Sequence, residues 1–176
     1  MSIMRTDLDR ALAVIQAATQ FDWTWTTDDL PSFAALVGWQ VDDLDQRLPT
    51  ITTNLDVNRT DAMVYLRYNA PPGTPRPIKS LWYYFTDVFL DDSSVKLLLD
   101  NAFDELTRQV RYLVEQPPAE SWTRDPDRML RWDLPNLVLK VMVNNQLGEV
   151  VLISPASQAR DDEFDRMLES SDEDAG

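Results

Sequence analysis

The chain contains no histidine and no cysteine among its 176 residues. Without histidine, it lacks the side chain that most often serves as a general base or metal ligand near neutral pH. Without cysteine, it forms no disulfide and has neither a thiol nucleophile nor a cysteine-based zinc site. A chain without cysteine is also typical of a reducing compartment. These absences exclude several common classes of enzyme and leave carboxylate chemistry open.

Glycine is scarce as well, with residues only at positions 38, 73, 148 and 176. This spacing fits neither glycine-rich fingerprint that cradles phosphate groups. No apolar run approaches the roughly 20 residues of a membrane span, and the N-terminal residues lack the apolar core of a signal peptide. We therefore expect a cytoplasmic protein without a cofactor, with one domain over residues 1–169.

Basic residues are outnumbered by acidic ones, 16 against 30, which gives a formal net charge of −14. Residues from Arg160 onward contribute eight acidic and two basic side chains. Such a surface repels nucleic acid and anionic lipid and attracts basic proteins. The alternative is that the acidity serves solubility alone. We expect residues 170–176 to form a disordered acidic tail.

What the chain does contain is a long amphipathic helix, predicted over residues 92–116. Five apolar residues recur at steps of four and three, the period of a single buried helix face: Leu99, Phe103, Leu106, Val110 and Leu113. Pro117 and Pro118 then prevent the helix from continuing.

Strand patterns lie on both sides of this helix. Alternating or continuous apolar runs predict strands at 50–56, 62–69 and 81–89 before it, and at 129–132, 137–143 and 149–154 after it. Further helices are predicted at 3–19, from Thr26 or Thr27 to Val37, and at 157–169. No internal repeat is visible. The fold class is therefore α+β, with about six antiparallel strands, three before and three after the central helix, and helices at both ends. One continuous sheet and two separate halves both satisfy this pattern.

One stretch, residues 21–46, combines six aspartates and three tryptophans with no lysine or arginine. Aromatic anchors surrounded by charge of one sign are typical of protein-binding surfaces. We expect the partner surface to include these residues: Trp23, Trp25, Asp28, Asp29, Asp42, Asp43 and Asp45. For each tryptophan the alternative is a place in the core, because large aromatic side chains are mostly buried.

Catalysis by carboxylates is the remaining enzymatic possibility. The nearest acidic clusters are Asp42, Asp43 and Asp45, and Asp87 with Asp91 and Asp92. The first lacks the spacing and the glycine of a calcium loop, and the second fits the start of the central helix. Neither cluster predicts convergent catalytic groups, so we expect a protein without enzymatic activity and without a bound metal.

Three segments resemble a family of small, acidic, uncharacterised actinobacterial proteins: residues 22–31 (DWTWTTDDLP) with Gly38 and Trp39, residues 53–62 (TNLDVNRTDA), and residues 99–103 (LDNAF). The likeness spans about residues 20–155. Such proteins resemble those encoded beside secreted polymorphic toxins and type VII secretion genes, and the order of elements also resembles the secretion-chaperone-like fold.

This resemblance implies an immunity protein that binds the catalytic domain of a cognate toxin, with a basic surface, and occludes it. A chaperone or adaptor for a secretion substrate is the alternative. The resemblance transfers no catalytic residue, and it leaves the oligomeric state open.

Overall fold

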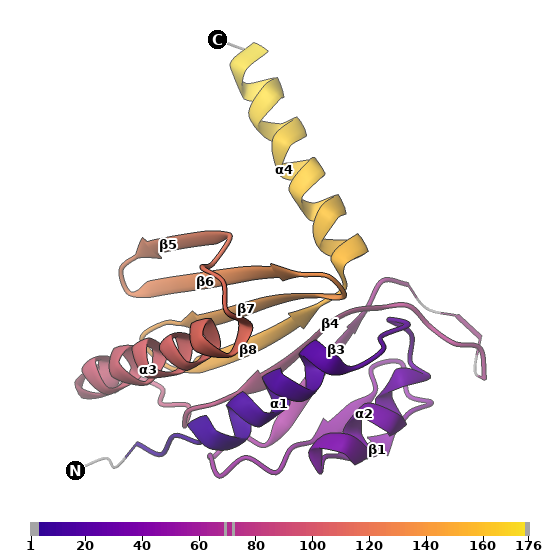
Figure 1. Cartoon of the computed structure of the whole chain (residues 1–176), viewed down its shortest axis with the longest axis horizontal. Coiled ribbons are helices and arrows are strands. Elements are labelled where there is room, and N and C mark those ends of the chain that lie inside the picture. Colours follow the sequence, from indigo (N-terminus) through magenta and orange to yellow (C-terminus); the bar gives the residue numbers. More distant parts are fainter. Residues whose placement is uncertain (1–3, 69, 72, 175–176) are drawn as a thin grey trace.

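The structure, a computed structural model, describes residues 4–68, 70–71 and 73–174 (Figure 1). In chain order its elements are α1 (Leu8–Gln20), α2 (Asp29–Val37), β1 (Gln40–Asp43), β2 (Thr50–Thr52), β3 (Asp61–Leu66), β4 (Ile78–Tyr84), the 3-10 turn η1 (Ser93–Val95), α3 (Lys96–Val114), β5 (Glu120–Arg124), β6 (Asp127–Leu134), β7 (Leu137–Val143), β8 (Gly148–Ile153) and α4 (Pro155–Asp174). Residue 3, where the first helix was expected to begin, lies outside the described residues, and so does residue 69 of the expected second strand.

The strands form one continuous antiparallel sheet in the order β1-β2-β3-β4-β8-β7-β6-β5. Each half of the sheet is a meander of four consecutive strands that follows a helical segment, and the last strands of the halves, β4 and β8, pair at the centre. The topology therefore repeats although the sequence does not. The α+β class and the antiparallel arrangement are confirmed, and the sheet is continuous.

The expected number of about six strands is wrong, because the sheet has eight. The two additional strands are the edge strands β1 and β5, whose side chains are almost all exposed. An edge strand pairs on one side only, and these two bury no face, so they carry no apolar alternation. The first expected strand is also shorter, since β2 ends at Thr52.

The core lies between the sheet and the helices α1 and α3, which pack side by side on one face (Figure 1). Four of the five residues of the predicted α3 stripe are buried, Leu99, Phe103, Leu106 and Val110, and the fifth, Leu113, is half-buried. α1 is fixed to the central strand β4 by the Tyr83 hydroxyl, which donates to the Ala11 carbonyl oxygen at 3.0 Å. Burial raises the pKa of this tyrosine.

The C-terminal cap of α2 also follows the sequence. Gly38 takes a left-handed conformation with φ 79°, and the Trp39 amide donates to the Ala34 carbonyl oxygen at 2.8 Å. A Cβ atom at this glycine would lie 2.9 Å from Asn54 Nδ2. The cap turns the chain from α2 into β1, the strand that carries Asp42 and Asp43.

The last helix differs from its expected bounds. α4 runs through Asp174, so residues 170–174 are helical where a disordered tail was expected, and residues 175–176 lie outside the described residues. The helix begins at Pro155, whose missing amide hydrogen costs nothing in a first turn. Beyond Asp162 the described side chains are exposed, so no buried face marks where the helix ends.

Candidate functional site

Trp23 belongs to the core. It is stacked on Trp25 with ring centroids 4.5 Å apart, and it lies 4.8 Å from the Phe33 ring. Its indole Nε1 donates to the Ala18 carbonyl oxygen at 2.9 Å. Trp23 was expected on the partner surface. In the structure its indole is buried, and its N–H already has a hydrogen-bond acceptor.

Trp25 is half-buried and fixes the connection between α1 and α2. Its Nε1 donates to the Asn136 carbonyl oxygen at 3.0 Å, and its backbone is left-handed with φ 57°. The indole borders a hollow of about 430 Å³ whose other walls include Arg67 and Pro155. Of the two tryptophans, which both border this hollow, Trp25 is the more exposed.

Asp29 is buried, with 5% of its surface exposed. Its carboxylate accepts hydrogen bonds from the amides of Thr24 and Trp25 at 3.0 and 2.7 Å, and from the Thr24 hydroxyl at 2.8 Å. This charge holds the strained turn at Trp25 against the start of α2, where a carboxylate is also favoured by the helix dipole. The Asp29 carboxylate is therefore used within the fold.

The other four aspartates of the expected surface, Asp28, Asp42, Asp43 and Asp45, are exposed. Asp42 accepts a hydrogen bond from the Thr52 hydroxyl at 2.7 Å, and Asp43 accepts one from the Asp45 amide at 3.0 Å. Within the part of the chain that the structure describes, no lysine or arginine forms an ion pair with any of the four. We call these four residues the acidic end.

Acidic residues elsewhere are often neutralised by the chain itself. Arg131 binds Asp133 and Asp162, and Arg128 binds Asp100 and Asp104. The Arg131 guanidinium lowers the pKa of the Asp162 carboxyl. The acidic end differs from these sites because its described carboxylates form no ion pair within the chain. They are therefore free to bind a cation from another molecule.

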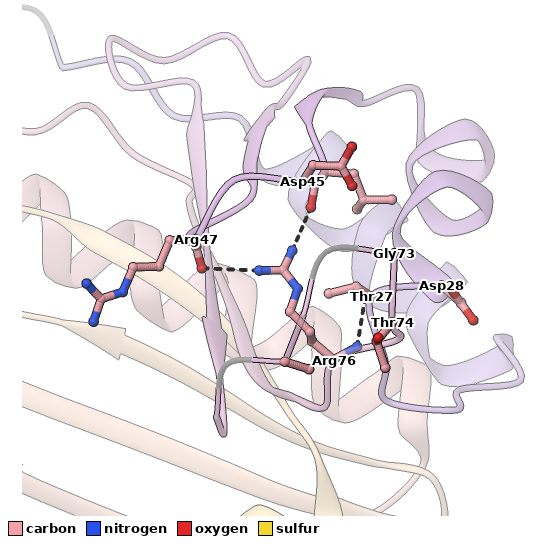
Figure 2. Close-up of a pocket in the computed structure, with 9 residues that line it drawn as sticks. Thr27, Asp28, Asp45, Arg47, Gly73, Thr74 and Arg76 are labelled. Carbon is pink, nitrogen blue, oxygen red and sulfur yellow. Dashed lines mark hydrogen bonds between the residues drawn. The ribbon is translucent and has the colours of Figure 1, made fainter.

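A pocket of about 410 Å³ lies beside the acidic end (Figure 2). Thr27 and Asp28 come from the start of α2, Leu44, Asp45 and Arg47 from the β1–β2 loop, and the remaining lining residues, Ala70, Gly73, Thr74 and Arg76, from the segment between β3 and β4. Segments far apart in the sequence therefore meet at one place. Figure 2 shows the carboxylates of Asp28 and Asp45 directed away from the Arg76 guanidinium.

Arg76 holds the walls of this pocket together. Its Nη2 donates to the Leu44 carbonyl oxygen at 2.6 Å, and its Nη1 donates to that of Gln46 at 2.8 Å and weakly to that of Arg47 at 3.4 Å. Its amide donates to the Thr27 hydroxyl at 3.1 Å. Only 8% of the residue is exposed. The planar fork of donors suits several carbonyl oxygens at once.

Sequence analysis did not single out Arg76, which lies in the proline-rich segment after β3. The available signal was a single arginine between Pro75 and Pro77. Two flanking prolines restrict the backbone and remove neighbouring donors, so the arginine itself supplies the hydrogen bonds that fasten the segment.

The chemistry available at the acidic end is electrostatic attraction. Asp28 and Asp45 offer carboxylates at the pocket rim, and Asp42 and Asp43 extend the same charge along β1. Among residues 4–68, 70–71 and 73–174, no group of three or more acidic side chains is placed to hold a metal ion. The arrangement suits lysine or arginine side chains of another protein.

None of the described helices has the length and apolar character needed to cross a membrane. Neither the curated proteins nor the solved structures contain a match to this chain. Residues 9–154, most of the chain, match the family of unknown function DUF6301. The chain belongs to this family.

Proposed function

We propose that this protein is an immunity protein, which binds the catalytic domain of a cognate secreted toxin and occludes it. The observation that carries the proposal is the acidic end: Asp28, Asp42, Asp43 and Asp45 are exposed on adjoining segments, and within the described residues none forms an ion pair. A basic protein surface would supply the missing cations.

Rigidity supports this role. The β1–β2 loop is fastened by Arg76 through three backbone carbonyl oxygens, and β1 is paired with β2. A binding surface whose backbone is already ordered loses less conformational entropy when its partner docks. The aspartates therefore meet a partner in a nearly fixed arrangement.

Charge supports it as well. The net charge of −14 surrounds the whole molecule with a negative potential. A basic partner is drawn in at long range by this potential and oriented at short range by the acidic end. Enzymatic activity is not part of the proposal, because binding alone blocks the catalytic site of the toxin.

The proposal is tested with the protein encoded beside this gene. Its C-terminal domain is purified, its enzymatic activity is assayed, and this protein is titrated into the reaction. We expect inhibition that is complete near one equivalent, while an unrelated protein of similar net charge leaves the activity unchanged. Full toxin activity in the presence of excess protein would contradict the proposal. A neighbouring secretion substrate without a toxin domain that nevertheless binds would favour the chaperone or adaptor instead.

A further inference from the structure

The first two turns of α4 are fixed to the sheet. The Gln158 amide donates to the Ser154 carbonyl oxygen at 3.0 Å, and Arg131 binds both carboxylate oxygens of Asp162 at 3.0 and 2.8 Å. Lys79 lies 3.5 Å from the Asp161 carboxylate. These contacts fix the direction in which the helix leaves the body. Figure 1 shows α4 pointing away from the sheet and from α2 and β1.

Beyond Asp162 the helix carries an apolar stripe that is largely exposed. Phe164 and Met167 are each 61% exposed and Leu168 is 49% exposed. Their spacing of three and four places them on one helix face. In α3 the same kind of stripe packs against the sheet. We call Phe164, Met167 and Leu168 the α4 stripe.

The charge around the α4 stripe determines what kind of partner can bind it. From Asp161 to Glu173 the sequence has seven acidic residues and one basic residue, Arg166. The last turn of the helix carries no basic residue, so the negative end of the helix dipole meets like charge. A second copy of this chain would bring the same acidic helix alongside and be repelled. A basic partner would neutralise both the side chains and the dipole.

We propose that the exposed part of α4 docks a basic amphipathic helix of another protein. Apolar residues of that helix cover the α4 stripe, and its lysine or arginine side chains lie against Glu163 and Asp165, which flank the stripe on either side. This docking site is separate from the acidic end, and it does not depend on whether the partner there is a toxin. A helix-to-helix contact of this kind uses anchors three and four residues apart.

The probe is a fluorescently labelled synthetic peptide, LKKLLKLLKKLLKL, added to the full-length protein. The variant Phe164→Ser/Leu168→Ser removes two members of the α4 stripe without changing the net charge. Its control is Leu97→Ser/Leu98→Ser, which removes two exposed leucines from α3. We expect at least tenfold weaker peptide binding by the α4 variant, as measured by fluorescence anisotropy, and wild-type binding by the control. The peptide LEELLELLEELLEL is expected not to bind.

A second variant keeps the test independent of helix formation. Glu163→Gln/Asp165→Asn retains the α4 stripe and should also weaken binding of the basic peptide at low salt, with far-UV circular dichroism used to check that helix content is kept. The variant Asp42→Asn/Asp43→Asn/Asp45→Asn should bind the peptide like the wild type, which separates this proposal from the proposed function. Equal binding by the wild type and Phe164→Ser/Leu168→Ser would overturn the docking site. Dimerisation of the wild type that this pair of changes abolishes would also overturn it, by making a second copy the occupant.

Discussion

Arg76 is a buried cation whose described partners are backbone oxygens. Three carbonyl groups of the β1–β2 loop accept hydrogen bonds from its guanidinium. Removing the guanidinium leaves these acceptors to find water in a confined space. Residues that satisfy several buried polar groups are therefore more costly to remove than exposed residues of the same type.

Arg76→Ala is predicted to lower the free energy of unfolding by about 1–3 kcal/mol, the range for hydrogen-bond partners left unsatisfied. The matched control is Arg47→Ala, because Arg47 is an exposed arginine of the same pocket. It should change stability by less than about 0.5 kcal/mol. Urea denaturation of both variants provides the measurement. Equal effects of the two substitutions would show that Arg76 does not fasten the loop.

Titration of the half-buried Glu149 carboxyl makes the free energy of unfolding depend on pH. It lies on β8, and burial raises the pKa of its carboxyl from 4.5 to about 7. Below pH 4.5 both the folded and the unfolded state hold the proton, and above pH 7 neither does. Between these values only the folded state holds it, so the free energy of unfolding falls as the pH rises through this window.

Glu149→Gln is predicted to remove that fall, which we expect to be about 1–3 kcal/mol after allowance for partial exposure. The variant should consequently be more stable than the wild type at pH 8. The control Glu105→Gln changes an exposed carboxyl whose pKa is lowered by hydrogen bonds from Gln109 and Arg108, so it titrates below this window. Denaturation midpoints at several pH values measure the effect. Parallel pH profiles for the wild type and Glu149→Gln would contradict it.

Helix α3 joins the two halves of the sheet and supplies much of the core. Phe103→Ala and Leu106→Ala should each cost about 2–5 kcal/mol, the range for large-to-small changes in a packed interior. Tyr112→Ala on the same helix is the control, because Tyr112 is 88% exposed. Denaturant midpoints for the three variants should separate clearly. If Tyr112→Ala proved as costly as Leu106→Ala, the assigned buried face of α3 would be wrong.

The elements differ in how far their sequences determine them. α3 and strands β3, β7 and β8 each bury at least one face, and apolar periodicity predicts such elements. β1 and β5 bury no face, so their sequences look like polar loops. The exposed half of α4 has no packing to mark its end.

The candidate site shows the same division between local pattern and tertiary placement. The cluster of aspartates is visible in the sequence, but tertiary contacts decide which of its residues are buried and which are exposed. Asp29 differs from its neighbour Asp28 only in facing Thr24 and Trp25, and Trp23 differs from Trp25 in packing against Phe33. Arg76 depends on a loop far away in the sequence. Which surface binds a partner stays a prediction.

At the scale of the whole molecule, the net charge of −14 predicts fast and salt-sensitive association with a basic partner. The Debye length shrinks from about 30 Å at 0.01 M salt to about 3 Å at 1 M, which confines the attraction to direct contacts. The association rate constant should fall at least roughly tenfold over this range, with a smaller change in the dissociation rate. Stopped-flow mixing measures both rates. An association rate independent of salt would exclude electrostatic steering.

Two variants of equal charge test whether the acidic end contacts the partner. Asp42→Asn/Asp43→Asn/Asp45→Asn is compared with Asp9→Asn/Asp125→Asn/Asp127→Asn, which changes three exposed aspartates away from that end. Both variants change the net charge equally, so a difference between them reports local contact. Both should keep the melting temperature within about 3 °C of the wild type, since exposed charges contribute little to stability.

The measurement is the dissociation constant for the proposed toxin partner, determined by isothermal titration calorimetry. We expect the first variant to bind roughly five- to thirtyfold more weakly than the wild type, or about 1–2 kcal/mol from three exposed charge pairs. The second variant should stay within about twofold of the wild type. Equal affinities for the two variants would contradict the account and place the contact surface elsewhere on the molecule.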